Sequence, residues 1–169
     1  GDHRDLHSFP SRRSSDLEHQ IPGILVMDTP GHEIFTNLRS RGGSAADIAI
    51  LVVDANRGFQ PQTNESLKIL ESRKVPFVVA LNKTDMVSGW KNTETQFISQ
   101  SIKEQNVEVQ NFLDEKIYNV VTALSVLGYQ SEAFYRIDDY KKEIAIVPVS
   151  AKTGIGIPEL FAVLVGLTQ

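Results

Sequence analysis

Short apolar runs alternate with amphipathic segments along this chain. Four runs have the length and composition of buried strands, at residues 24–27, 48–54, 76–81 and 144–149. A run this short and this apolar is typical of a strand that is covered on both faces of a parallel sheet. The pattern therefore predicts a sheet whose strands are joined by longer connections.

The apolar spacing in those connections is that of helices. The predicted helices are residues 33–41, 61–74 and 157–167. In the second of them Pro61 stands in the first turn, and Leu67 and Leu70 lie three residues apart and are expected to face the sheet. Strands and helices that alternate at this spacing predict an α/β fold with a mostly parallel sheet flanked by helices.

The apolar pattern changes over about residues 91–140, and we interpret this stretch as a helical insertion before the last strand. Its apolar residues fall at helical steps and end at Gly128, which predicts one long amphipathic helix or two shorter ones. The stripe consists of Ile102, Val109, Leu113, Ile117, Val120, Leu124 and Leu127. We expect it to be core packing and not a binding surface.

Residues 1–17 differ from the rest because they are polar, rich in Arg, Ser and His, and have no helical or strand period. They could be a disordered tail, a basic arm, or translated adapter sequence at the end of an assembled fragment. We favour the third interpretation and leave them out of the fold. Native sequence is then expected to begin near Glu18, with residues 18–169 forming a partial domain.

Composition narrows the class of protein. The length of 169 residues suits one domain, and the absence of cysteine excludes disulfides and thiolate metal sites. The net charge of −4 argues against a free-standing nucleic-acid binder, which would carry a basic face. We find no direct nucleic-acid signature, no membrane-spanning run and no signal peptide, so a cytoplasmic location is expected.

Candidate chemistry begins where the first predicted strand ends, at Asp28-Thr29-Pro30-Gly31-His32. Ligands of open α/β sheets bind at the carboxyl ends of the strands. Here a carboxylate, a glycine whose N–H can approach an anion closely, and an imidazole follow one another. The motif alone is weak, because an ordinary Asp-Pro-Gly turn would look the same.

Two more strand ends carry polar motifs. Asn82-Lys83-Thr84-Asp85 follows the third predicted strand, and Ser150-Ala151-Lys152-Thr153-Gly154 follows the fourth. Because carboxyl ends of parallel strands meet at one edge of a sheet, all three motifs are expected there together. In this order they resemble the GTP-binding domain of the P-loop GTPases.

The resemblance implies how a guanine base is read. Asp85 would accept from the two adjacent N–H donors of guanine, which adenine lacks. The long stems of Lys83 and Lys152 would cover the two faces of the base. The Ser150-Ala151 turn would aim a backbone N–H at the guanine carbonyl oxygen, while Asn82 would brace the loops.

The first motif would then serve the phosphates and the hydrolysis. Asp28 would hold Mg²⁺, through a water molecule, since Mg²⁺ keeps much of its hydration shell. The Gly31 N–H would meet the terminal phosphate of GTP, and His32 would orient the attacking water. GTP or GDP and Mg²⁺ are therefore the expected cofactors.

Further sequence motifs narrow the resemblance to one branch of the translational GTPases. The histidine after Gly31, the run Gly58-Phe59-Gln60-Pro61-Gln62-Thr63 and the pair Gly89-Trp90 look like the initiation factor two family, in its archaeal and eukaryotic branch called initiation factor five-B. This resemblance covers about residue 20 to the end. It implies a factor that promotes ribosomal subunit joining with GTP hydrolysis, with the ribosome and the initiator tRNA machinery as partners.

One feature departs from that family. The phosphate-binding loop G-x-x-x-x-G-K-[ST] is absent, because the first lysine is Lys68. The switch threonine that would complete the coordination of Mg²⁺ is also missing, because the first threonine is Thr29. We therefore expect a domain truncated at its N-terminus, without the first strands, and inactive by itself. Two alternatives stay open: another translational or ribosome-associated GTPase, and a guanine-binding module without hydrolysis.

Overall fold

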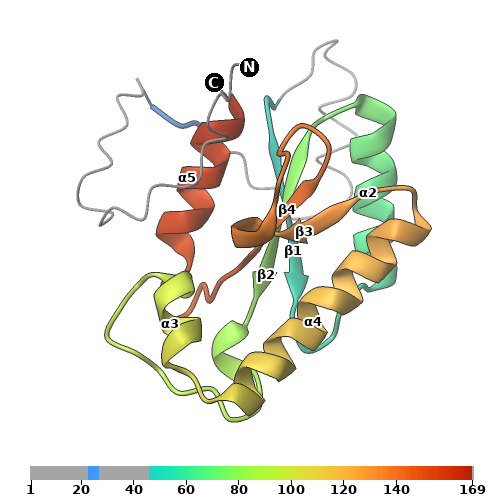
Figure 1. The fold of residues 1–169 in the computed structure, drawn as a ribbon. Coiled ribbons are helices and arrows are strands. Elements are labelled where there is room, and N and C mark those ends of the chain that lie inside the picture. The colour runs from blue at the N-terminus through green and yellow to red at the C-terminus, as the bar shows by residue number, and fades with distance from the viewer. Residues whose placement is uncertain (1–22, 27–45, 169) are drawn as a thin grey trace, which may run out of the picture.

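A parallel sheet with helices on both faces forms the centre of the molecule (Figure 1). The computed structural model describes residues 23–26 and 46–168. The elements in chain order are β1 (Ala49–Asp54), α2 (Pro61–Arg73), β2 (Phe77–Asn82), η2 (Thr84–Met86), α3 (Ile98–Glu104), α4 (Val107–Val126), β3 (Ser131–Ala133), η3 (Phe134–Arg136), β4 (Ile144–Pro148) and α5 (Ile157–Thr168). The strands are arranged in the order β1-β2-β4-β3, and each neighbouring pair is parallel.

Most of the predicted elements are confirmed. Three predicted strands correspond to β1, β2 and β4, and two predicted helices correspond to α2 and α5. As expected, α2 begins at Pro61 and buries Leu67 and Leu70 against the sheet. The predicted helix at residues 33–41 lies outside the described residues.

The first predicted strand is wrong for the residues that the structure describes. Ile24, Leu25 and Val26 form no strand, and their exposed fractions are 51%, 86% and 75%. The expectation that the second strand is covered on both faces is also wrong, because Ile50 and Val52 are 43% and 61% exposed. An apolar run is buried only where a neighbouring strand pairs with it and another layer covers it. The described elements provide neither for residues 24–26. Strand β1 pairs with β2, and among the described elements only the cover over Ile50 and Val52 is missing.

The core lies in two layers, one on each face of the sheet. Helices α2 and α4 pack on one face, and α5 packs on the other (Figure 1). Strand β2 joins the layers, because Val79 and Leu81 belong to the first cluster whereas Val78 and Ala80 belong to the second. This alternation follows from the two-residue period of a strand.

The segment predicted as a helical insertion contains two α-helices, a short strand and the short 3-10 helix η3. Gln105 and Asn106 separate α3 from α4, and the Asn106 side chain accepts from the Val109 N–H at 2.9 Å. The apolar stripe is core, as expected, except that Leu127 is 45% exposed. Strand β3 was not expected, because three residues without an apolar run carry no strand signal; it forms by pairing with β4.

Candidate functional site

The carboxyl ends of β1, β2 and β4 lie side by side at one edge of the sheet. Asp54 pairs in register with Asn82, and Leu81 pairs with Pro148. The loops that follow β2 and β4 therefore begin next to each other, at the lower end of the sheet in Figure 1. Two of the three motifs singled out from the sequence are brought together in this way.

Asn82 and Thr84 tie the two loops to each other. The Asn82 Oδ1 accepts from the Ala151 N–H at 3.0 Å, although the two residues are 69 positions apart. Thr84 is fully buried; its N–H donates to the Val149 carbonyl at 3.1 Å and its hydroxyl to the Leu81 carbonyl at 3.2 Å. The loops thus form one braced unit, as we expected for Asn82, while the contribution of Thr84 was missed.

The backbone amides of the second loop are not all available to a ligand. The sequence predicted that the Ser150-Ala151 turn would direct a backbone N–H at a base. The Ala151 N–H already donates to Asn82. By contrast, no acceptor within the described residues contacts the Lys152 N–H. The amide that is ready to donate is therefore that of Lys152, and the contact of Ala151 with a base stays a prediction.

The Lys83 side chain forms an ion pair with an acid that sequence reasoning overlooked. Its Nζ lies 2.9 Å from Asp54 Oδ2, at the end of β1. The other oxygen, Asp54 Oδ1, accepts from the N–H groups of Asn56 and Arg57, at 2.8 and 3.2 Å. The side chain of Asn56 in turn donates to the Lys83 carbonyl at 3.4 Å. A third loop, the one after β1, is thereby connected to the motif.

Asp54 could have been found by the rule that led to the other motifs, since it too is a polar residue at a strand end. Partial burial raises the pKa of Asp54, but the Lys83 ammonium and the Asn56 and Arg57 amides lower it more, so the net pKa lies below its usual value. Lys83 itself has a left-handed backbone, with φ 65°. Such a conformation is uncommon outside glycine, and it is held here by the surrounding hydrogen bonds.

Asp85 differs from these braced residues because its carboxylate is not used. It lies half-buried in η2, next to the ion-paired Lys83. In the part of the chain that the structure describes, no hydrogen bond or ion pair engages its oxygens. Two free acceptor oxygens at this edge can receive a pair of N–H donors from a ligand.

The loop after β4 is a tight turn that closes on Ser150. The Ser150 hydroxyl accepts from the Thr153 N–H at 3.2 Å, and its carbonyl accepts from the Gly154 N–H at 2.8 Å. Gly156 has φ 77°, and a Cβ there would overlap the Pro148 carbonyl oxygen. The glycine is therefore required for the return of the chain toward α5.

The residues of the first motif lie outside the described residues. Asp28, Gly31 and His32 keep their expected roles toward Mg²⁺, the terminal phosphate and the attacking water as predictions. In the stretch from residue 46 to 168 and in residues 23–26, no group of three or more His, Cys, Asp or Glu is placed to hold a metal ion. No helix in those same stretches is long and apolar enough to cross a membrane.

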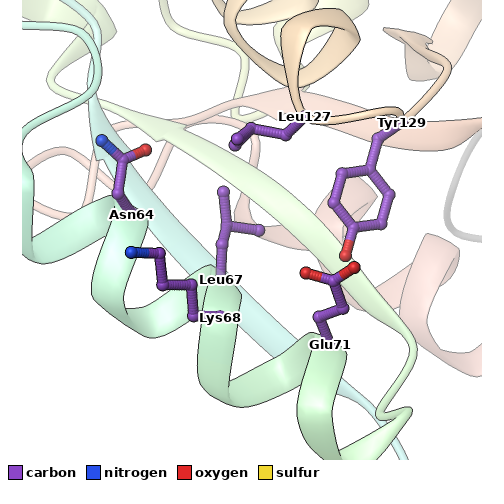
Figure 2. A pocket seen from close by; sticks show the side chains of 6 residues that line it. All are labelled: Asn64, Leu67, Lys68, Glu71, Leu127 and Tyr129. Carbon is purple, nitrogen blue, oxygen red and sulfur yellow. The ribbon is translucent and has the colours of Figure 1, made fainter.

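A pocket of about 260 Å³ lies elsewhere, between α2 and the turn after α4 (Figure 2). It is lined by Asn64, Leu67, Lys68, Glu71, Leu127 and Tyr129. Partial burial and the Glu71 carboxylate raise the pKa of Tyr129, whose hydroxyl points toward Glu71 in Figure 2. The pocket contains none of the residues that the motifs singled out, so the strand ends are the better candidate site.

Comparison with known proteins agrees with the motifs. Residues 11–169 match the family described as Elongation factor Tu GTP binding domain. This match begins within residues 1–17, which we interpreted as non-native sequence. The boundary at residue 17 stays a prediction. A probable translation initiation factor IF-2 of Sulfurisphaera tokodaii is 57% identical over 95% of this chain and 27% of its own length. A probable IF-2 of Ignicoccus hospitalis is 57% identical over 89% of this chain and 25% of its own length.

Comparison with solved structures agrees with the sequence relatives. The crystal structure of GDP-bound aIF5B from Aeropyrum pernix is similar with a TM-score of 0.85 and 52% identity, over 90% of this chain and 26% of that one. The elongation factor SelB of Methanococcus maripaludis, at 24% identity and a TM-score of 0.53, covers 84% of this chain and 25% of its own and shares the fold. This chain spans about a quarter of the length of the curated relatives that it matches.

Proposed function

Because the chain belongs to the Elongation factor Tu GTP-binding domain family, we propose that the joined loops after β2 and β4 bind the guanine base of GTP or GDP. The observation that carries this proposal is the unused carboxylate of Asp85, next to a loop that Asn82 braces against Ala151. A free acceptor pair on a rigid edge is what recognition of a base with two adjacent donors requires.

The chemistry of guanine fits these residues. Its ring N–H and its exocyclic amine would both donate to the Asp85 carboxylate, and its carbonyl oxygen would accept from the free N–H of Lys152. Each hydrogen bond to a charged group contributes about 1.5–3 kcal/mol, so adenine, which cannot form the pair, would bind far more weakly. The exposed stems of Lys83 and Lys152 would lie along the base.

The phosphate end of the nucleotide would be served by the first motif. We assign Asp28 to Mg²⁺, the Gly31 N–H to the terminal phosphate and His32 to the water that attacks it. Mg²⁺ would neutralise charge on the phosphate oxygens when it is bound. His32 would act by orienting a water molecule, which is a contribution separate from base recognition.

The relatives suggest the process in which this chain takes part. They are named probable translation initiation factor IF-2, and this chain corresponds to 27% of the length of one of them. We infer a role in translation initiation, as part of a GTPase that promotes ribosomal subunit joining. Its partners would be the ribosome and the initiator tRNA machinery, in the cytoplasm.

The test of base recognition is Asp85→Asn in this chain, with nucleosides as ligands. Nucleosides test the base site without the phosphate residues, and ligand-observed NMR detects them at millimolar affinity. We expect the unchanged chain to prefer guanosine over xanthosine and adenosine by about tenfold or more. In Asp85→Asn the side-chain N–H₂ would face the exocyclic amine of guanosine, so two donors would oppose each other. Xanthosine has a carbonyl at that position, which can accept from the N–H₂. The preference should therefore change from guanosine to xanthosine.

Asp138→Asn is the matched control, because Asp138 is an exposed acid in the loop before β4, at the opposite end of that strand. It should leave all three affinities unchanged. If Asp85→Asn kept the guanosine preference, Asp85 would not be the residue that reads the base.

A further inference from the structure

One carboxylate bonds the start of the helical insertion to the last helix. Glu159, in the first turn of α5, accepts hydrogen bonds from the Ile98 N–H and from the N–H and hydroxyl of Ser99. The Ser99 N–H lies 3.2 Å from Glu159 Oε2, although the two residues are 60 positions apart. Glu159 therefore connects α5 with the first residues of α3.

A second contact joins the same region to the loop after β4. The Gly156 N–H donates to the Gln96 carbonyl at 2.9 Å. A Cβ placed on Gly154 would lie 2.8 Å from Gln96 Oε1, so the loop backbone passes directly against this side chain. Gln96 thus contacts the turn that follows Lys152 at Gly154 and Gly156. Glu159 fixes the helix that comes after this turn to the same segment.

The segment that carries Gln96 also leads away from Asp85. It runs from η2 through Trp90, whose backbone N–H donates to the Val87 carbonyl at 2.9 Å. Farther along, the Gln105 side chain brackets Lys91, accepting from its N–H at 2.9 Å and donating to its carbonyl at 2.7 Å. One braced segment therefore continues directly from the loop after β2 and contacts the loop after β4 through Gln96.

We propose that Glu159 and Gln96 are positioning residues that keep the loop Ser150–Gly156 in its base-binding conformation, and so couple the helical insertion to guanine affinity. The inference rests on the proposed function, since it concerns the same site. Coupling between two places in a protein is reciprocal. If the Glu159 contacts increase guanosine affinity by some factor, bound guanosine must favour formation of those contacts by the same factor.

The effect is expected to be local, because other contacts hold the fold. Helix α5 keeps its apolar packing through Leu160, Val163 and Leu164, and the loop keeps its bond to Asn82. Removing the carboxylate should free the turn without unfolding the sheet. Amide hydrogen exchange can separate these cases, since it reports local opening residue by residue.

The experiment compares Glu159→Ala, Glu159→Gln and Ser99→Ala in this chain. We expect Glu159→Ala to weaken guanosine binding by about fivefold or more, at the lower end of typical couplings. Glu159→Gln keeps one acceptor oxygen and should lose less, and Ser99→Ala removes a single donor and should also lose less. The Gly156 amide should exchange faster in Glu159→Ala, while the Val149 amide, which donates to Leu81 inside the sheet, should not change.

Glu104→Gln is the control, because Glu104 ends α3 and, among the described residues, its carboxylate hydrogen bonds only with the exposed Gln100 side chain. It should alter neither affinity nor exchange. In the unchanged chain, saturating guanosine should slow the exchange of the Ser99 and Gly156 amides, and this effect should disappear in Glu159→Ala.

The outcomes separate the two proposals. If the unchanged chain prefers guanosine but Glu159→Ala binds it within twofold of that affinity, the coupling is overturned and base recognition stands. If the unchanged chain shows no preference for guanosine, the proposed function fails and the coupling fails with it. If Glu159→Ala does not fold, Glu159→Gln and Ser99→Ala decide by the same criteria, and equal loss of protection at Gly156 and Val149 would mean a purely structural role.

Discussion

Gly156 is the residue on which the turn after the candidate site most directly depends. Its φ of 77° lies in the left-handed region, and a Cβ would meet the Pro148 carbonyl oxygen and come within 3.1 Å of the Val149 Cα. Both neighbours are backbone, so they cannot move aside as a flexible side chain could. The carbonyl of β4 and the loop would have to separate to admit any other residue.

Gly156→Ala should therefore destabilise the chain by about 1–3 kcal/mol or more, from backbone strain and overlap together. Gly166→Ala is the matched control, because Gly166 lies in α5 with open space around it. It should stabilise by about 0.5–1 kcal/mol, since glycine inside a helix costs conformational entropy. Urea unfolding of the two variants measures both effects, and equal effects would contradict the strain argument.

At the scale of elements, α4 is the helix whose sequence and structure agree most fully. It begins after the cap residue Asn106 and buries one apolar face along its length, including Val109, Ile117 and Leu124. Strand β3 is the opposite case. Its three residues form a strand because the edge of β4 is available to pair with Ser131–Ala133. A helix is specified mainly by local periodicity, whereas a short edge strand depends on its neighbour.

Asn106→Ala should cost about 1 kcal/mol of stability, because the cap oxygen would no longer accept from the Val109 N–H. Asn119→Ala serves as the control, since Asn119 is exposed in the middle of the same helix. That change should stay within about 0.5 kcal/mol of the unchanged chain. Chemical denaturation monitored by circular dichroism measures both, and a loss as large at Asn119 would argue against capping.

At the scale of the whole molecule, stability should depend on pH through two acids that act in opposite directions. The pKa of Asp54 is lowered, so its contribution is present at neutral pH and is lost as the pH falls through the folded value. Burial raises the pKa of Glu159, and the bonds from Ser99 and Ile98 lower it less. The contribution of Glu159 to the free energy of unfolding therefore decreases as the pH rises from its ordinary pKa to the raised pKa of the folded state.

Asp54→Asn isolates the first of these contributions. At pH 7 it should lower the free energy of unfolding by less than about 1 kcal/mol, because Lys83 is 52% exposed and water screens the ion pair. The difference from the unchanged chain should shrink as the pH falls below 3.8, the ordinary value for aspartate. Thermal melts from pH 7 to about pH 2 measure it, and a constant difference would mean that the ion pair contributes nothing.

The sequence by itself determined the elements whose signals are local. Periodicity predicted α2, α5 and three of the four strands, because an amphipathic helix or a buried apolar run is recognisable over a few residues. The order of the motifs at strand ends also predicted that Asn82 and Ser150 lie at one edge. That prediction needed only the rule that carboxyl ends of parallel strands coincide.

The tertiary structure alone decided which groups at that edge are occupied and which are free. Asn82 takes the N–H of Ala151 across 69 positions, and Glu159 reaches Ser99 across 60. Such pairings depend on strand register and on helix packing, which no local pattern encodes. Ile24 to Val26 make the same point, because an apolar run becomes a buried strand only where a neighbouring strand can accept its hydrogen bonds.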